Sequence, residues 1–239
     1  MPDQAPPVSI VIPAKDEAVR LPPSIRAIRA AFPSEPWEFL IVVEKSSDGT
    51  ADLARDAAGG DPRFLIQENP IARGKGYAVR TGMLRARGDW VFFMDADLSV
   101  PLACVGEFLA SREIADVLIG SRRHPETQLL RRQPFLREAS GRFFNMSLRF
   151  LGVTRLLDTQ CGFKAFRREA AREIFSRVEQ DGFGFDVEVV VLADILGYRM
   201  LERPVRWTDA DGSKVRPLDG VMALVEAVLA ARRLRRKYS

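Results

Sequence analysis

The first half of the chain alternates between short apolar runs and longer stretches in which apolar residues recur every three or four positions. The apolar runs predict strands, because unbroken aliphatic and aromatic runs suit strands that are buried on both faces. The amphipathic stretches predict helices. The predicted strands are Val8–Pro13, Glu38–Val43, Phe64–Gln67, Trp90–Met94 and Asp116–Gly120, and the predicted helices are Leu21–Ala31, Thr50–Ala58, Gly76–Arg87 and Leu102–Ser111.

This order predicts an α/β fold, because parallel strands need helical crossovers that cover both faces of an open sheet. The pattern changes beyond Gly120. The elements predicted there are an arginine-rich helix at Leu136–Leu151, a strand at Cys161–Phe166, and helices at Glu169–Ser176, Val187–Leu196 and Met222–Arg236. We find no internal repeat or clear linker, so we expect residues 1–239 to form a single compact domain.

Composition narrows the classes of protein to consider. The 239 residues are 46% hydrophobic and 28% charged, which is typical of a globular chain with a sizeable core. Cys104, Cys161 and the single histidine, His124, have no metal-ligand or disulfide spacing, so a reducing compartment is the default. No apolar run reaches the ~18 residues of a membrane span, and the N-terminus does not resemble a signal peptide. We expect a cytoplasmic protein that is soluble or peripheral to a membrane.

The net charge of +4 is mild, but arginine is concentrated in the second half of the chain. Such clusters suit phosphate groups on nucleic acid, on a lipid or on a small substrate. No nucleic-acid-binding motif and no aromatic stacking run accompanies them, so we do not expect a nucleic-acid partner. The plainer alternative for any single arginine is a solvated helix face.

A pair of aspartates follows the apolar run Trp90–Met94. Asp95 and Asp97 are one residue apart at the predicted carboxyl end of that strand, which is the edge where open α/β sheets bind ligands. Carboxylates placed there can hold Mg²⁺ or Mn²⁺ against phosphate oxygens. A lone D-x-D is also common in turns, so the motif alone leaves both interpretations open.

Other loops are expected at the same edge. Pro13 to Glu17 follows the first strand, Glu44 to Thr50 follows the second, and Ala72 to Gly76 precedes a helix. Glycines in the Gly-Lys-Gly segment would let the backbone approach a ligand at the helix N-terminus, while Arg73 and Lys75 supply positive charge. Each loop is weak evidence by itself, and none has the spacing of a P-loop.

Taken together and in order, these segments resemble the inverting family-2 glycosyltransferases of GT-A fold. Val8–Pro13, Ser46-Ser-Asp-Gly-Thr50, Gly74-Lys-Gly76 and Asp95-Ala-Asp97 carry the resemblance in the first half. In the second half, Asp158-Thr-Gln-Cys-Gly-Phe-Lys164, Gly184-Phe-Asp-Val-Glu188, Val205-Arg-Trp-Thr208 and Gly212-Ser-Lys214 are similar to the dolichyl- and polyprenyl-phosphate β-glucosyltransferases. The resemblance runs from about Val8 to Pro217.

The resemblance implies a GT-A fold, Rossmann-like, with an open and mostly parallel sheet flanked by helices. It divides the chain into a sugar-nucleotide half (1–120), an acceptor half (121–217) and a C-terminal amphipathic and basic helix (218–239). The nucleotide-binding residues that it implies are Pro13, Ala14, Glu17, Glu44, Asp48, Lys75, Asp95, Ala96, Ser213 and Lys214. Glu44 stands where the family usually has Asp, and Ser99 stands where the mannosyl branch has Gln.

The resemblance also implies the chemistry. Asp95 and Asp97 would hold Mg²⁺ or Mn²⁺, and Asp97, Lys75 and Asp158 would be catalytic. Asp158 would orient the acceptor or the metal, although the same residue could simply cap a turn. The implied reaction is metal-dependent, inverting transfer of a hexose, glucose from UDP-glucose, to a polyprenyl or dolichyl phosphate.

Three arginines are candidates for the acceptor phosphate, because a guanidinium grips phosphate in a fork. They are Arg122, Arg131 and Arg137. The lipid acceptor implies a peripheral enzyme at the inner face of the cell membrane. Apolar residues of the last helix, followed by basic residues up to Lys237, suit an interfacial helix, and a core-packing helix with a solvated basic tail is the equal alternative.

Other functions stay open from sequence alone. Within the enzyme class they are mannosyl transfer from GDP-mannose and glycosyl transfer to a soluble acceptor. A sugar-nucleotide-binding protein without turnover is the non-enzyme alternative. A nucleotidyltransferase is disfavoured, because the loop after the first strand is not the Gly-rich triphosphate loop that such an enzyme would need.

Overall fold

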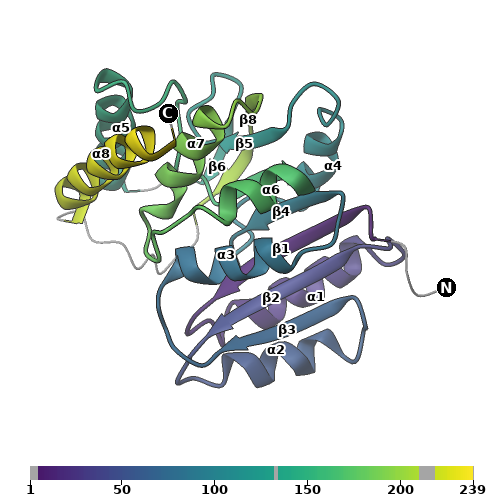
Figure 1. The fold of residues 1–239 in the computed structure, drawn as a ribbon. Coiled ribbons are helices and arrows are strands. Elements are labelled where there is room, and N and C mark those ends of the chain that lie inside the picture. The colour runs from purple at the N-terminus through teal and green to yellow at the C-terminus, as the bar shows by residue number, and fades with distance from the viewer. Residues whose placement is uncertain (1–4, 132–133, 210–218, 239) are drawn as a thin grey trace.

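The computed structural model describes residues 5–131, 134–209 and 219–238, with side chains of the last segment described from residue 223. Within these ranges a mixed seven-stranded sheet has the order β3-β2-β1-β4-β7-β5-β8, and β6 and β9 form a separate pair (Figure 1). The strands are β1 Val8–Ala14, β2 Glu38–Glu44, β3 Phe64–Asn69, β4 Trp90–Met94, β5 Val117–Ser121, β6 Gln128–Arg131, β7 Phe163–Arg167, β8 Met200–Pro204 and β9 Arg206–Thr208. The helices are α1 Leu21–Ala31, α2 Thr50–Ala58, α3 Lys75–Arg85, α4 Cys104–Leu109, α5 Phe135–Phe150, α6 Arg168–Phe175, α7 Phe185–Ile195 and α8 Asp219–Tyr238.

The predicted α/β fold is confirmed. The strands β3, β2, β1 and β4 run parallel to one another, whereas β7 lies antiparallel between β4 and β5. All residues of β1, β2, β4 and β5 are buried, which explains why these strands read as continuous apolar runs.

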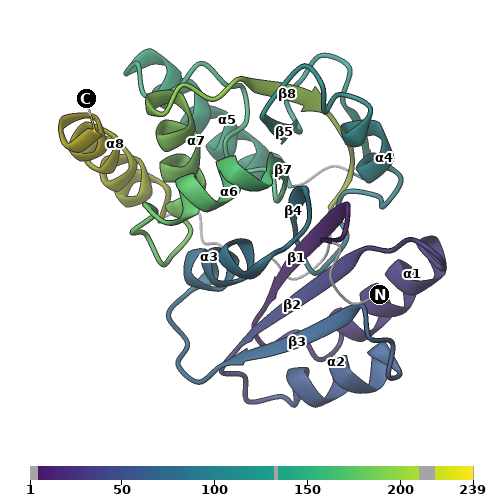
Figure 2. The ribbon, with the colours of Figure 1, turned by 45° about the vertical axis from the view of Figure 1, so that its right-hand side comes forward.

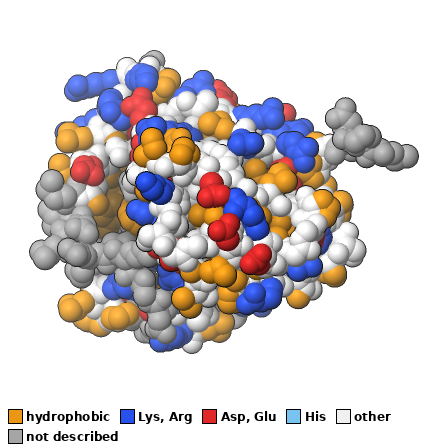
Figure 3. Space-filling view, turned by 90° about the horizontal axis from the view of Figure 1, so that it is seen from below, with side chains coloured by type: hydrophobic (Ala, Val, Ile, Leu, Met, Phe, Trp, Pro, Cys, Tyr) orange, Lys and Arg blue, Asp and Glu red, His pale blue; other side chains and the backbone are white. Residues whose placement is uncertain are grey.

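Two apolar layers cover the two faces of the sheet. Alternate residues of β1 point to opposite sides, so that Ile10 and Ile12 pack with α1, α2 and α4, whereas Val11 packs with α3, α6 and α7. The ribbon views show α1 and α2 behind one half of the sheet, with α3 and α6 in front (Figures 1 and 2). Seen from below, hydrophobic side chains reach the surface in separate patches among basic ones (Figure 3).

Sequence reasoning missed three strands: β6, β8 and β9. β8 is only half-buried along its whole length and ends in Pro204, as suits an edge strand without a continuous apolar run. The short strands β6 and β9 pair in parallel although Gln128 and Arg206 lie far apart in the sequence. Local pattern carries little information about such short pairings.

Candidate functional site

The site lies where the direction of strand addition reverses. From β1 the chain crosses to β2 and then β3 on one side, and α3 returns it to β4 on the other side of β1. The carboxyl ends of β1 and β4 therefore lie side by side, at Ala14 and at Asp95. In open α/β sheets this reversal opens a crevice in which ligands bind.

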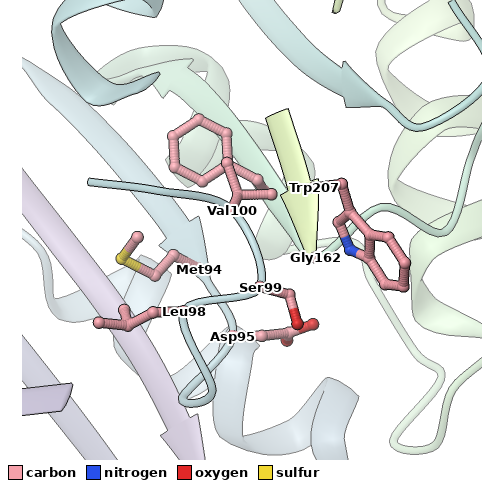
Figure 4. Close-up of a pocket in the computed structure, with 8 residues that line it drawn as sticks. Met94, Asp95, Leu98, Ser99, Val100, Gly162 and Trp207 are labelled. Atoms are coloured by element: carbon pink, nitrogen blue, oxygen red, sulfur yellow. The ribbon is translucent and has the colours of Figure 1, made fainter. Parts of the chain in front are cut away.

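A tight turn presents the two aspartates. The amide of Leu98 donates to the carbonyl of Asp95 at 3.3 Å, and the amide of Ser99 donates to Asp97 Oδ1 at 3.0 Å. Leu98 adopts a left-handed backbone conformation with φ of 50°, which is uncommon for a residue with a side chain. The turn holds Asp95 beside the pocket whose lining Figure 4 shows.

Lys75 is paired with the first aspartate. Its Nζ lies 2.7 Å from Asp95 Oδ1, and the two side chains are 24% and 33% exposed. The ammonium also lies 5.3 Å from the ring centroid of Phe93 and 5.9 Å from that of Phe183. Burial alone would lower the pKa of Lys75, but the carboxylates of Asp95 and then Asp186 outweigh it and raise the pKa, so the lysine stays charged.

A second ion pair lies deeper behind this one. Lys164 Nζ lies 2.6 Å from Asp186 Oδ1 and donates to the carbonyl of Cys161 at 2.7 Å, and both members of the pair are buried. Burial raises the pKa of Asp186, against the opposing effects of Lys164 and Lys75. The charges of Asp95, Lys75, Asp186 and Lys164 thus alternate in sign from the pocket into the core.

Gly162 packs directly against the site, and sequence reasoning did not identify its role. Its carbonyl accepts a hydrogen bond from the amide of Asp95 at 3.0 Å, and a Cβ at this position would lie 1.8 Å from Asp95 Oδ2. Gly162 and Trp207 line the pocket together with Asp95 and Ser99 (Figure 4). The sequence alone did not indicate this contact, because Gly162 lies next to Asp95 only through the antiparallel pairing of β7 with β4.

Glu44 supports the loop that carries Lys75. The residue is only 2% exposed. Its carboxylate accepts hydrogen bonds from the backbone amides of Arg73 at 3.3 Å and Gly74 at 2.7 Å. The structure therefore places Glu44 under the start of α3, where it anchors the Gly-Lys-Gly segment. Direct contact between Glu44 and a nucleoside base stays a prediction.

The loops after β1 and β2 are tied to each other. Asp48 accepts the amides of Ala18 at 3.0 Å and Thr50 at 3.1 Å, and the amide of Glu17 donates to Thr50 Oγ1 at 2.9 Å. Burial would raise the pKa of Asp48, but hydrogen bonds from Thr50 and Ala18 lower it below its ordinary value. Both carboxylate oxygens of Glu17 accept from Arg20 at 2.6 Å. These hydrogen bonds hold the predicted nucleotide-binding residues Glu17 and Asp48 in neighbouring loops at the carboxyl ends of β1 and β2.

Asp158 is paired with one of the predicted phosphate-binding arginines. Arg122 Nε and Nη2 donate to its two oxygens at 2.7 and 2.9 Å, and Asp158 is fully buried. Burial would raise the pKa of Asp158, but Arg122 outweighs it and holds the pKa at about 2. In this arrangement Asp158 orients the Arg122 guanidinium, which lies 5.9 Å from the Trp207 ring centroid.

Strand β9 joins the second half of the chain to the site. The amide of Thr208 donates to the carbonyl of Ser99 at 2.9 Å, and the amide of Asp209 donates to the carbonyl of Arg131 at 3.1 Å. Arg137 Nη1 lies 3.5 Å from Asp209 Oδ1. These contacts place the segments that carry Arg131 and Arg137 close to Ser99, which lines the pocket. Ser213 and Lys214 lie outside the described residues.

The residues at the end of β4 fit a hard divalent cation that is shared with a phosphate ligand. Mg²⁺ commonly keeps several waters and takes one or two protein carboxylates plus substrate phosphates. Asp95 and Asp97 supply such carboxylates and are both partly exposed. Among the described residues no cluster of three or more acidic, histidine or cysteine side chains could form an all-protein metal cage. A metal held here by Asp95 and Asp97 would complete its coordination with water and phosphate oxygens.

Among the curated proteins, the chain is similar to dolichyl-phosphate beta-glucosyltransferases. It is 34% identical to the one from Drosophila melanogaster over 88% of this chain and 69% of that protein. It is 31% identical to the one from Dictyostelium discoideum over 94% of this chain and 73% of that protein. None of the helices in the described ranges combines the length and apolarity that spanning a membrane requires.

Among solved structures, mannosyl-3-phosphoglycerate synthase from Rubrobacter xylanophilus matches with a TM-score of 0.70 at 23% identity, over 97% of this chain and 75% of that one. Glucosyl-3-phosphoglycerate synthase from Mycobacterium tuberculosis, in complex with Mn²⁺, uridine-diphosphate and glucosyl-3-phosphoglycerate, matches with a TM-score of 0.65 at 22% identity, over 96% and 80% of the two chains. These likenesses show the GT-A fold. The model of the family "Glycosyl transferase family 2" matches residues 9–175, and the chain belongs to that family.

Proposed function

We propose that this enzyme transfers glucose from UDP-glucose to the phosphate of a polyprenyl or dolichyl phosphate, with inversion at the anomeric carbon. The observation that carries the proposal is the similarity, over most of the chain, to relatives named dolichyl-phosphate beta-glucosyltransferase. The paired Lys75 and Asp95 at the sheet reversal support it, because the reaction must bring together two anionic substrates.

The acceptor needs little activation. A phosphate monoester has its second pKa near ~6, so a lipid phosphate is largely a dianion at neutral pH. One of its oxygens forms the new bond to the anomeric carbon while the bond from that carbon to the diphosphate breaks. The electron pair leaves with UDP, no proton has to move, and an α-linked donor gives a β-linked product.

The protein must stabilise the charge on the leaving diphosphate. Asp95 and Asp97 would hold Mg²⁺ or Mn²⁺, which supplies positive charge to the diphosphate oxygens when it is bound. Lys75 contributes a fixed ammonium in a partly buried site, where its charge is screened less than in water. The buried Lys164–Asp186 pair behind it keeps Lys75 between two carboxylates.

The acceptor phosphate is proposed to bind on the side of the pocket formed by β6, β9 and the loop after β5. Arg122 is held in place by Asp158, and Arg137 by Asp209. Asp158 is fully buried, so we assign it a positioning role for Arg122 in place of direct contact with substrate. Arg131, at the end of β6, completes the proposed set.

The test is release of nucleoside diphosphate by the purified protein with Mg²⁺ or Mn²⁺. UDP-glucose and GDP-mannose are offered separately, each with a polyprenyl phosphate, with 3-phosphoglycerate or without acceptor, and Asp97→Ala is the control. Lipid-dependent release from UDP-glucose that Asp97→Ala abolishes would support the proposal.

Other outcomes point to the alternatives. Release from GDP-mannose alone would indicate a mannosyltransferase, and release that depends on 3-phosphoglycerate would indicate a soluble acceptor. Metal-dependent nucleotide binding with no release under any condition would indicate a binding protein without turnover.

A further inference from the structure

One face of α5 is apolar and exposed along its entire length. Exposed residues recur every three or four positions, so they lie on one side of the helix. The large apolar side chains on this face are Phe135 (82% exposed), Leu136 (76%), Phe143 (58%), Met146 (61%) and Phe150 (89%). Single exposed apolar residues are ordinary on a soluble protein, but a stripe of several large apolar side chains indicates a binding surface.

The opposite face of α5 already holds the helix on the protein. Phe144, Asn145 and Leu148 are buried, and Asn145 Oδ1 accepts the backbone amide of Thr159 at 2.9 Å. The helix also contacts α8, and both ribbon views place α5 and α8 at the end of the molecule away from α1 and α2 (Figures 1 and 2). The exposed stripe therefore is not needed to attach α5 to the core.

The charged residues on the same face of α5 indicate the kind of surface that the stripe binds. Arg142 and Arg149 are exposed on the same face as Phe143 and Phe150. The sole acidic residue of α5, Glu138, is paired with Arg142 at 2.5 Å and its side chain is only 20% exposed. An apolar face bordered by arginines matches an anionic lipid surface, where the aromatic rings enter the headgroup region and the arginines meet phosphates.

The position of α5 relative to the pocket gives the stripe a use. The helix starts shortly after β6, which pairs with β9, and Trp207 of β9 lines the pocket beside Asp95. The Arg137–Asp209 pair ties the first turn of α5 to the end of β9. Phe135 and Leu136 thus lie at the end of the stripe that is nearest the proposed acceptor arginines.

Helix α8 is less suited to this contact than its sequence indicates. Its buried residues include Ala227, Ala231 and Leu234, so it packs as a core helix. Arg233 pairs with Glu179 and Glu188, and Lys237 pairs with Glu179. The core-packing alternative describes α8 better, although Val225 and Leu229 remain exposed.

We propose that the exposed face of α5 is a membrane-docking surface that lies in the headgroup region of an anionic lipid bilayer. This inference rests on the proposed function for its purpose, since a polyprenyl phosphate would reach the pocket from the same bilayer. Its physical basis is the combination of a stripe of exposed large apolar side chains, two arginines on the same face and the absence of an unpaired acidic residue in α5.

The test is flotation of the full chain with phosphatidylcholine vesicles, with and without phosphatidylglycerol. The double variant Phe143→Ser/Phe150→Ser removes apolar area, and Arg142→Gln/Arg149→Gln removes charge. The matched control is Ile114→Ser. Ile114 is 65% exposed but lies just before the amino end of β5, whereas the pocket lies at the carboxyl end of β4. We expect binding to the anionic vesicles only, and a loss of about tenfold or more in partitioning for the apolar variant.

The charge variant should lose binding most at low salt, and the control should bind as the wild type does. Wild-type binding by the apolar variant, or no binding of the wild type to anionic vesicles, would overturn the proposal. Sedimentation velocity tests whether a second copy of the chain binds the stripe instead of a membrane. A dimer that dissociates in Phe143→Ser/Phe150→Ser, with vesicle binding unchanged, would also overturn the proposal. UDP release with a short, detergent-soluble polyprenyl phosphate tests the proposed function separately, because we expect the α5 variants to retain it.

Discussion

Gly162 and Asp95 are in such close contact that no side chain fits between them. The amide of Asp95 donates to the Gly162 carbonyl at 3.0 Å, and a Cβ on Gly162 would lie 1.8 Å from Asp95 Oδ2 and 2.3 Å from Cγ. The atoms in the way belong to the end of a side chain that can rotate. A substitution at Gly162 is therefore expected to displace the Asp95 carboxylate and to leave the strand pairing intact.

We expect Gly162→Ala to fold but to lose about 10²-fold in UDP release, since a shift of about 1 Å in a reacting group can cost that much. Circular dichroism and release assays check both parts. The control is Gly106→Ala in α4, where a Cβ would meet nothing within 4 Å, and this variant should keep full activity. Wild-type activity of Gly162→Ala would show that the Asp95 position is not critical.

Lys75→Met tests the ammonium beside Asp95. We expect a loss of about 10²- to 10³-fold in turnover, because the variant removes a fixed charge from a partly buried site. Nucleotide affinity, measured by calorimetry with Mg²⁺, should fall less than turnover if the charge acts mainly on the leaving diphosphate. Lys45→Met is the matched control, since Lys45 is exposed in the loop after β2. Equal losses in both variants would point to general charge effects and not to the pairing with Asp95.

Sequence pattern predicted the strands β1 to β5, most of which are buried along their whole length, and it predicted which loops follow their carboxyl ends. Trp90–Met94 and the aspartates after it illustrate this. The roles of Gly162 and Trp207 were not predictable, because they arise from pairings between distant segments. The sequence also did not show that Asp158 and Glu44 are buried. Both carry the charge expected of ligand-binding residues, but in the structure they hydrogen-bond to neighbouring loops.

Lys164→Met should destabilise the protein by about 3–5 kcal/mol, because it leaves Asp186 buried without its partner at 2.6 Å. Replacing both members, as in Lys164→Met/Asp186→Leu, should recover most of that loss, since two apolar side chains need no partner. Urea denaturation measures the difference. Lys237→Met, which breaks the exposed pair with Glu179, should change the midpoint little. A double variant as unstable as the single one would mean that the ion pair is not the source of the loss.

Asp158→Asn separates a positioning role from direct participation in the reaction. A positioning role predicts a higher KM for the acceptor phosphate, with the KM for UDP-glucose close to that of the wild type, because Asp158 touches Arg122 and is fully buried. Initial rates with each substrate varied in turn provide the measurement. A loss confined to kcat, with both KM values unchanged, would instead support a catalytic role for Asp158.

The same residue should govern part of the stability in acid. The pKa of Asp158 is held at about 2, below its ordinary value of 3.8, since Arg122 outweighs the effect of burial. A depressed pKa means that the folded state binds its proton less readily than the unfolded state. The stabilisation, about 2 kcal/mol, is therefore complete above pH ~4 and is lost as the pH falls towards ~2.

Asp158→Asn should be less stable than the wild type at neutral pH, and this difference should shrink over that interval in urea titrations at fixed pH. Asp52→Asn is the control, because the side chain of Asp52 is 85% exposed, and its stability should follow the wild type throughout. A difference that stays constant from pH 6 to pH 2 would contradict the assigned linkage.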